Sequence, residues 1–85
     1  MNFKEIKNKQ AYLEENYPFE PVPNLTERKY CYHCGRNFNV GDFKVVLNYA
    51  VESKQTEEHI VCPNAPLCDG NVFDWGSERF FDNGL

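Results

Sequence analysis

The chain has 85 residues, of which 41% are hydrophobic and 26% are charged. These proportions are those of an ordinary folded domain, and they exclude a fully disordered chain. Thirteen acidic residues against nine basic ones give a formal net charge of −4, which excludes a general electrostatic attraction to nucleic-acid phosphates. A single domain of this size buries too little surface for its hydrophobic core alone to stabilise the fold, so we expect an additional stabilising element.

The first segment, residues 1–24, combines a helical pattern with a proline-rich connector. Apolar side chains recur there at helical spacing, at Phe3, Ile6, Leu13 and Tyr17. This spacing predicts an amphipathic helix over residues 3–17 with Asn2 as its N-cap. Three prolines follow within six residues and favour an extended connector up to Asn24. The segment either packs on the rest of the domain or binds a partner, and packing is the favoured interpretation.

Residues 25–76 have the pattern of a small β module. Apolar and polar residues alternate over residues 43–49, which predicts a half-buried strand. A second strand over residues 54–61 follows a short loop, so the two should form a hairpin. Residues 71–75 are a third expected strand, and residues 77–85 are a C-terminal tail. We therefore expect a small β-rich domain of about three antiparallel strands with an N-terminal helix.

Four cysteines lie in two turns of this module. Cys31 and Cys34 are separated by two residues and followed by Gly35. This spacing lets both sulfurs face one ion, while glycine can take the positive φ that a tight turn needs. Cys62 and Cys68 are separated by five residues, and the expected hairpin carries this second turn back to the first. Paired turns bridged by a hairpin predict a tetrahedral four-cysteine metal site.

The same four cysteines could form two disulfides, as they would in a small secreted domain. Residues 1–17, however, carry several charged side chains and contain neither an apolar signal region nor a small-residue cleavage site. We therefore expect a cytoplasmic location, where cysteines stay reduced and can bind metal. The longest aliphatic run covers only residues 45–47, far fewer than the roughly 18 residues of a membrane span, so we expect no membrane association.

About half of the chain, from Tyr30 to Trp75, resembles a zinc ribbon. The pattern is most similar to the four-cysteine zinc finger at the C-terminus of bacterial type I topoisomerases, with its C-x2-C-G and C-x3-P-x-C turns. The matching residues are Cys31, Cys34, Gly35, Cys62, Pro66 and Cys68. The resemblance implies that the four cysteines are the ligands of one zinc ion and that the glycine and the proline shape the turns.

A second resemblance, to rubredoxins, rests on the C-x2-C-G turn and on the pair Cys62 and Pro63. It implies one iron ion and electron transfer. Rubredoxins place the fourth ligand three positions after the third, whereas Cys68 is six positions after Cys62. Zinc is therefore the favoured interpretation, with iron as the alternative.

Two histidines are further candidate ligands. His33 lies between two of the cysteines and is expected to be exposed, because the cysteines are better placed to bind zinc. His59 could complete a site of three cysteines and one histidine that leaves Cys68 free. Strand alternation directs positions 59 and 62 to opposite faces, so we favour the four-cysteine set.

A four-thiolate zinc site has no open coordination position for water or substrate, so we expect no enzymatic activity. The N-terminal helix and the proline-rich connector favour another protein as the partner. Nucleic acid is the alternative partner, because aromatic rings could stack on bases beside a basic patch of Arg28, Lys29 and Arg36.

Overall fold

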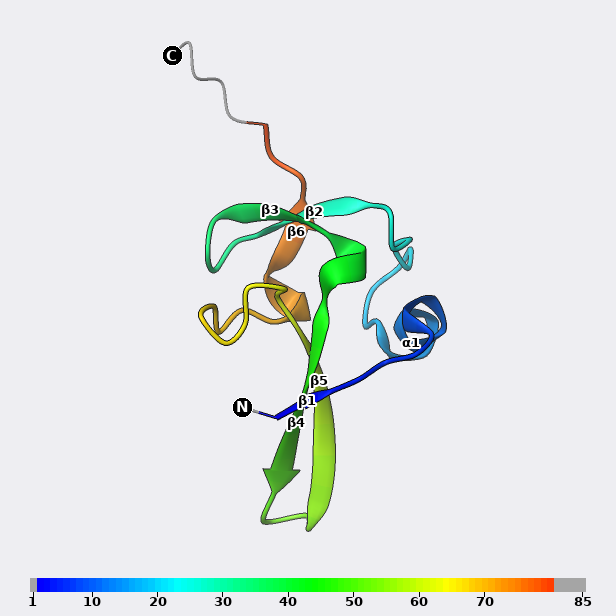
Figure 1. Cartoon of the computed structure of the whole chain (residues 1–85), viewed down its shortest axis with the longest axis vertical. Helices are drawn as coiled ribbons and strands as arrows, with labels where there is room; N and C mark the ends of the chain where they lie inside the picture. Colours follow the sequence, from blue (N-terminus) through cyan, green and yellow to red (C-terminus); the bar gives the residue numbers. More distant parts are fainter. Residues whose placement is uncertain (1, 81–85) are drawn as a thin grey trace.

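Two three-stranded antiparallel sheets and one short α-helix make up residues 2–80, which are the residues that the computed structural model describes. The elements in chain order are β1 (Asn2–Lys4), α1 (Lys9–Asn16), β2 (Arg28–Cys31), β3 (Arg36–Asn39), the 3-10 turn η1 (Val40–Asp42), β4 (Lys44–Ala50), β5 (Gln55–Val61), the 3-10 turn η2 (Val72–Asp74) and β6 (Trp75–Ser77). The sheet orders are β1-β4-β5 and β3-β2-β6. The β4–β5 hairpin extends away from the second sheet as an arm (Figure 1). Within the described range, none of the helices is long and apolar enough to cross a membrane.

The hairpin of β4 and β5 confirms the sequence prediction, but the number of strands is larger than expected. The pairing runs from Lys44 opposite Val61 to Ala50 opposite Gln55. Instead of about three strands, residues 2–80 contain six, because β1 pairs with β4 and β2 pairs with both β3 and β6. Strands of three or four residues are too short to show an alternation of their own, and they form through partners distant in the sequence.

The N-terminal helix is shorter than predicted, and the predicted N-cap is wrong. α1 begins at Lys9, and the side chain of Asn8 caps it by accepting a hydrogen bond from the Ala11 N–H at 3.1 Å. The predicted N-cap, Asn2, lies in β1 opposite Leu47 of β4. Pairing in a sheet satisfies backbone groups that the first turn of a helix would leave without intrahelical partners.

The third predicted strand, residues 71–75, is mostly a 3-10 turn. The Asn71 side chain accepts a hydrogen bond from the Phe73 N–H at 2.9 Å, and the Asp74 carboxylate accepts one from the Asn71 N–H at 3.0 Å. This reciprocal capping stabilises a turn. A strand therefore begins only at Trp75.

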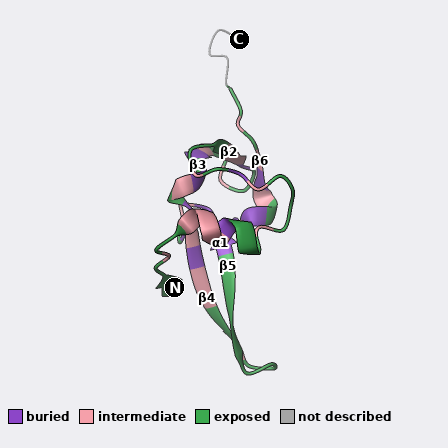
Figure 2. Cartoon of the chain, turned by 90° about the vertical axis from the view of Figure 1, so that its right-hand side faces the viewer, coloured by how far each residue is buried: buried purple, intermediate pink, exposed green. Residues whose placement is uncertain are grey.

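The hydrophobic core lies between the two sheets and is covered by α1. Its most deeply buried side chains are Phe43, Leu13, Val40, Val45, Pro23, Cys31 and Cys62. Leu13 comes from α1, so the helix docks on the domain, and Lys9 reinforces this contact by donating to the carbonyl oxygens of Gly41 and Phe43 at 2.7 and 2.8 Å. Burial is concentrated near the middle of the molecule, whereas the far end of the β4–β5 arm is exposed (Figure 2).

Candidate metal centre

The first cysteine turn joins β2 to β3. Cys31 is the last residue of β2, and the Gly35 N–H donates to its carbonyl oxygen at 2.8 Å. Gly35 has a φ of +74°, which a residue with a side chain rarely adopts. The turn therefore reverses the chain within four residues and brings Cys34 back toward Cys31.

The second cysteine turn follows β5. The Cys62 N–H donates to the Gly70 carbonyl oxygen at 3.1 Å and the Cys68 N–H to that of Asn64 at 3.1 Å, which closes the loop on itself. The Lys44 ammonium donates to the Ala65 carbonyl oxygen at 2.7 Å and fastens the loop to β4. The hairpin thus returns the second turn to the first, as the sequence predicts.

The four cysteine sulfurs form one cluster. All four Sγ atoms lie within 4.8 Å of one another, and the Cys31–Cys68 and Cys34–Cys62 pairs are each 3.8 Å apart. A tetrahedron with zinc–sulfur bonds of about 2.3 Å has edges of about 3.8 Å, whereas a disulfide bond measures about 2.0 Å. The cysteines are therefore free thiols arranged as a group that could hold a metal ion.

Burial and backbone hydrogen bonds act in opposite directions on these thiols. Burial raises the pKa of the Cys62 and Cys68 thiols, although the Asn64 and Gly70 N–H groups donate to their sulfurs at 3.4 and 3.2 Å. Burial acts in the same way on Cys31, but hydrogen bonds, chiefly from neighbouring backbone groups, outweigh it and leave the pKa of that thiol below its ordinary value. A metal ion would have to displace the protons from the two thiols whose pKa is raised.

Gly70 is a residue of the site that the sequence analysis missed. A Cβ atom at this position would lie 2.9 Å from the Cβ of His33, 3.0 Å from the Sγ of Cys31 and 3.2 Å from the Sγ of Cys68. Only a residue without a side chain lets the backbone approach the sulfurs this closely. The feature of the sequence that could have identified Gly70 as part of the site is its position, two residues after the last cysteine.

Neither histidine belongs to the sulfur cluster. His33 is exposed, as predicted, although its Nδ1 lies 3.5 Å from the Sγ of Cys68. His59 is exposed on β5 and pairs with Glu57 at 3.3 Å. The structure therefore gathers the four cysteines and does not bring His59 to them.

The three basic residues of the predicted patch do not share one face of their sheet. Arg28 and Lys29 are neighbours on β2 and so point to opposite faces. Arg28 is paired with Glu78 and also donates to Asn39 at 2.9 Å. Arg36 lies directly opposite Cys31, on the same face as Lys29. The positive charge of the patch is thus divided between two surfaces.

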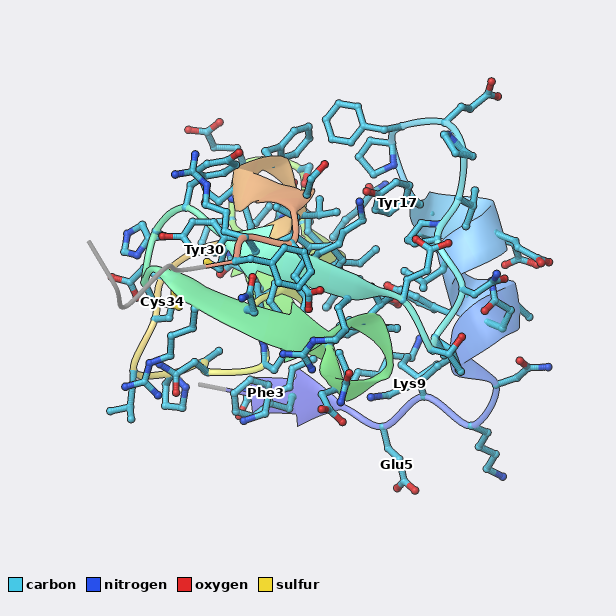
Figure 3. All side chains as sticks on the ribbon, turned by 90° about the horizontal axis from the view of Figure 1, so that it is seen from above. Phe3, Glu5, Lys9, Tyr17, Tyr30 and Cys34 are labelled. Atoms are coloured by element: carbon cyan, nitrogen blue, oxygen red, sulfur yellow. The ribbon has the colours of Figure 1, made fainter. Side chains whose placement is uncertain are left out.

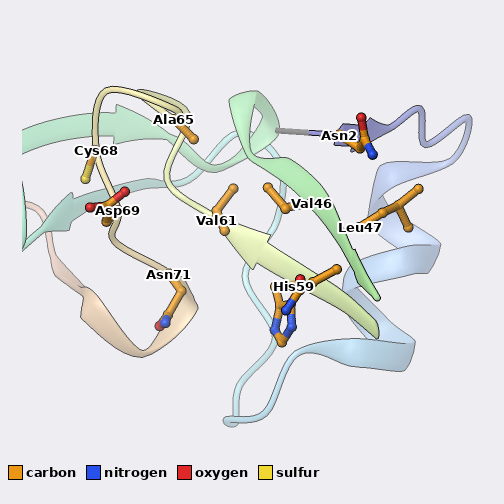
Figure 4. Close-up of a pocket in the computed structure, with 10 residues that line it drawn as sticks. Asn2, Val46, Leu47, His59, Val61, Ala65, Cys68, Asp69 and Asn71 are labelled. Atoms are coloured by element: carbon orange, nitrogen blue, oxygen red, sulfur yellow. The ribbon is translucent and has the colours of Figure 1, made fainter. Parts of the chain in front are cut away.

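An open pocket lies beside the metal centre, on the face of the first sheet that turns away from α1. Figure 4 shows Val46, Val61 and His59 along its middle, Asn2 and Leu47 at one end, and Cys68 and Asp69 at the other. Cys68 is almost completely buried, so this pocket gives little access to its sulfur.

No family model, curated protein or solved structure matches the chain. The geometry itself shows a small β-rich domain with a four-cysteine, ribbon-like site that could hold a metal ion. Because no match assigns the site, the resemblances to topoisomerase zinc fingers and to rubredoxins stay predictions.

Proposed function

We propose that this protein is a structural-zinc module of the cytoplasm that binds another protein. The observation that carries the zinc assignment is the sulfur cluster, in which two sulfur–sulfur distances of 3.8 Å match the edges of a tetrahedral zinc site. Tetrahedral sulfur sites suit zinc or iron. We propose zinc because a structural zinc ion does not require the protein to transfer electrons. Four free thiols in contact distance also fit a reducing compartment.

The zinc ion would stabilise the fold and leave no position for substrate. With four protein ligands the coordination is complete, so no water can be activated at the metal. The cysteines come from two turns that are distant in the sequence, and the ion would join these turns. Zinc bound in this way contributes on the order of 10 kcal/mol to folding, which offsets the small core. We therefore propose a binding role and no enzymatic activity.

The protein-binding role is supported by charge and by exposed apolar side chains. Four thiolates and one divalent cation would lower the formal charge of −4 by two, to −6, which disfavours phosphate backbones as partners. Large apolar side chains stand in solvent on several elements, among them Phe73 at 69%, Val51 at 76% and Leu67 at 89% exposure. Of these residues, Phe73 has an exposed aromatic neighbour, Phe19, which is 47% exposed and has its ring centroid 5.6 Å away. Exposed apolar groups that gather in one patch are typical of contact surfaces.

The metal assignment is tested by native mass spectrometry and an absorption spectrum of protein purified without added metal. One zinc ion per chain and no visible colour is the expected result. One iron ion with a red chromophore would make the protein an electron carrier. A metal-free chain four protons lighter would mean that the cysteines form two disulfides.

The partner class is tested by placing a photoreactive amino acid at Phe73, Val51 or Leu67 in cells and comparing it with the exposed polar position Glu52. We expect a protein cross-link from at least one apolar position and none from Glu52. Equal or absent cross-linking at all four positions would contradict the protein-binding role.

A specific contact favours nucleic acid as the second candidate. The Arg79 guanidinium lies over the rings of Tyr30 and Tyr32, 5.0 and 4.9 Å from their centroids, and such groups can stack on bases. Fluorescence anisotropy with single-stranded DNA and RNA over a salt series tests this role. A dissociation constant weaker than about 10⁻⁴ M at low salt would exclude it.

A further inference from the structure

Four aromatic side chains from separate parts of the chain line one surface groove. Tyr17 follows α1, Phe19 lies in the proline-rich connector, Phe73 belongs to η2 and Trp75 begins β6. We call this the aromatic groove. The ring centroids of Phe19 lie 5.9 Å from Tyr17 and 5.6 Å from Phe73, both edge to face, and Tyr17 lies 6.3 Å from Trp75. In Figure 3 Tyr17 lies beside α1, far from Cys34, so this end of the groove is away from the cysteines, whereas Trp75 is the β6 neighbour of Cys31.

The groove is held in place by the fold and presents two of its four rings, those of Phe19 and Phe73, to solvent. Phe73 is 69% exposed and Phe19 is 47% exposed. The backbone of Phe73 is fixed by the hydrogen bond to Asn71 described above, and Trp75 is paired with Cys31 in the second sheet. Trp75 is only 9% exposed and forms a buried wall of the groove. An exposed ring on a capped turn beside a buried ring on a paired strand is preorganised for binding, because little conformational freedom is lost when a ligand contacts the two rings.

The charges around the rings are mainly negative. Glu20 and Glu27 line the groove together with one basic residue, Lys29. Burial raises the pKa of the Tyr17 hydroxyl, and the nearby charge of Glu27 raises it further. In the described part of the chain the cation–π contacts belong to Lys9, Lys44 and Arg79, and none involves the four groove rings.

We propose that the aromatic groove binds a lysine or arginine side chain of a partner protein. Aromatic faces attract cations, and rings set at angles around one space are the usual means of recognising ammonium groups. An apolar ligand would pack against the rings but would not interact with the negative charges of Glu20 and Glu27. These two carboxylates therefore favour a cation as the ligand. This inference rests on the proposed protein-binding role and names the chemistry of the partner.

The test uses the full-length, metal-loaded protein and short capped peptides with one central lysine among glycine and serine. A matched peptide carries norleucine, which has nearly the same shape and no charge. Trp75 is the only tryptophan of the chain and lines the groove, so its fluorescence reports binding directly, and amide chemical shifts locate it. We expect the lysine peptide to bind about two- to thirtyfold more tightly than the norleucine peptide.

Two variants and one control assign this selectivity to the groove. Phe73→Ala should weaken binding of the lysine peptide at least about threefold, whereas Phe80→Ala, which removes an exposed ring outside the groove lining, should not change it. Glu27→Gln should weaken binding of the lysine peptide and leave the norleucine peptide unaffected. Equal binding of both peptides, no binding of either, or an unchanged affinity in Phe73→Ala would overturn the inference. Cross-linking to a protein that persists after such a result would preserve the protein-binding role and reject only the cationic occupant.

Discussion

Replacing Gly70 with alanine should weaken metal binding although all four cysteines stay in place. The added methyl group would lie 2.9 Å from the His33 Cβ and 3.0 Å from the Cys31 Sγ, so the loop after Cys68 would have to move outward. That movement would also stretch the hydrogen bond from the Gly70 N–H to the Cys68 sulfur, now 3.2 Å. Overpacking of this kind costs about 1–3 kcal/mol, which corresponds to a loss of about 5- to 150-fold in zinc affinity.

Competition with a chromophoric chelator at constant pH measures this loss. Asp69→Ala is the matched control, because Asp69 is the exposed neighbour in the same turn and its shortening adds no atom near the sulfurs. The control should bind zinc as the unchanged protein does. If Gly70→Ala also kept its full zinc affinity, the close approach of the backbone to the sulfurs would play no part in metal binding, and our account of this residue would be refuted.

Three further substitutions test the fold and its charges. Leu13→Ala should lower the free energy of unfolding by about 2–5 kcal/mol, because this completely buried side chain fixes α1 to the core; urea titration measures it, and a loss below 1 kcal/mol would argue against docking. Cys68→Ser should abolish stoichiometric zinc binding and cooperative unfolding, and unchanged metal content would defeat the four-cysteine assignment. Hydrogen bonds from Lys4 and Tyr12 hold the pKa of the Glu58 carboxyl below its ordinary value. The ionised carboxylate therefore stabilises the fold fully at any pH above the pKa of an unfolded glutamate. This stabilisation is lost as the pH falls through the lowered pKa of the folded state. Glu58→Gln should therefore reduce stability by less than about 1 kcal/mol at pH 7, since the pair is exposed, and should flatten the acid limb of the stability curve; an unchanged acid limb would contradict this.

Features with a local signal were predictable from the sequence. The β4–β5 hairpin follows from the alternation over residues 43–49 and from the short loop that precedes the second strand, because side chains of period two match a half-buried sheet. The gathering of Cys31, Cys34, Cys62 and Cys68 follows from the spacing within each turn together with that hairpin. In both cases the residues that carry the signal are close in sequence or are linked by one regular element.

The sequence by itself therefore determined the β-rich class, the hairpin and the four-cysteine cluster. The tertiary structure alone decided that Asn2–Lys4 is a strand, because its hydrogen-bond partners lie more than forty residues away in β4. It likewise decided the role of Gly70, which follows from the 3.0 Å that would separate a Cβ at this position from the Cys31 sulfur. The aromatic groove also belongs to this second group, since its four rings come from segments that the sequence separates. Contacts of this kind depend on how distant segments pack, and no local periodicity or spacing encodes them.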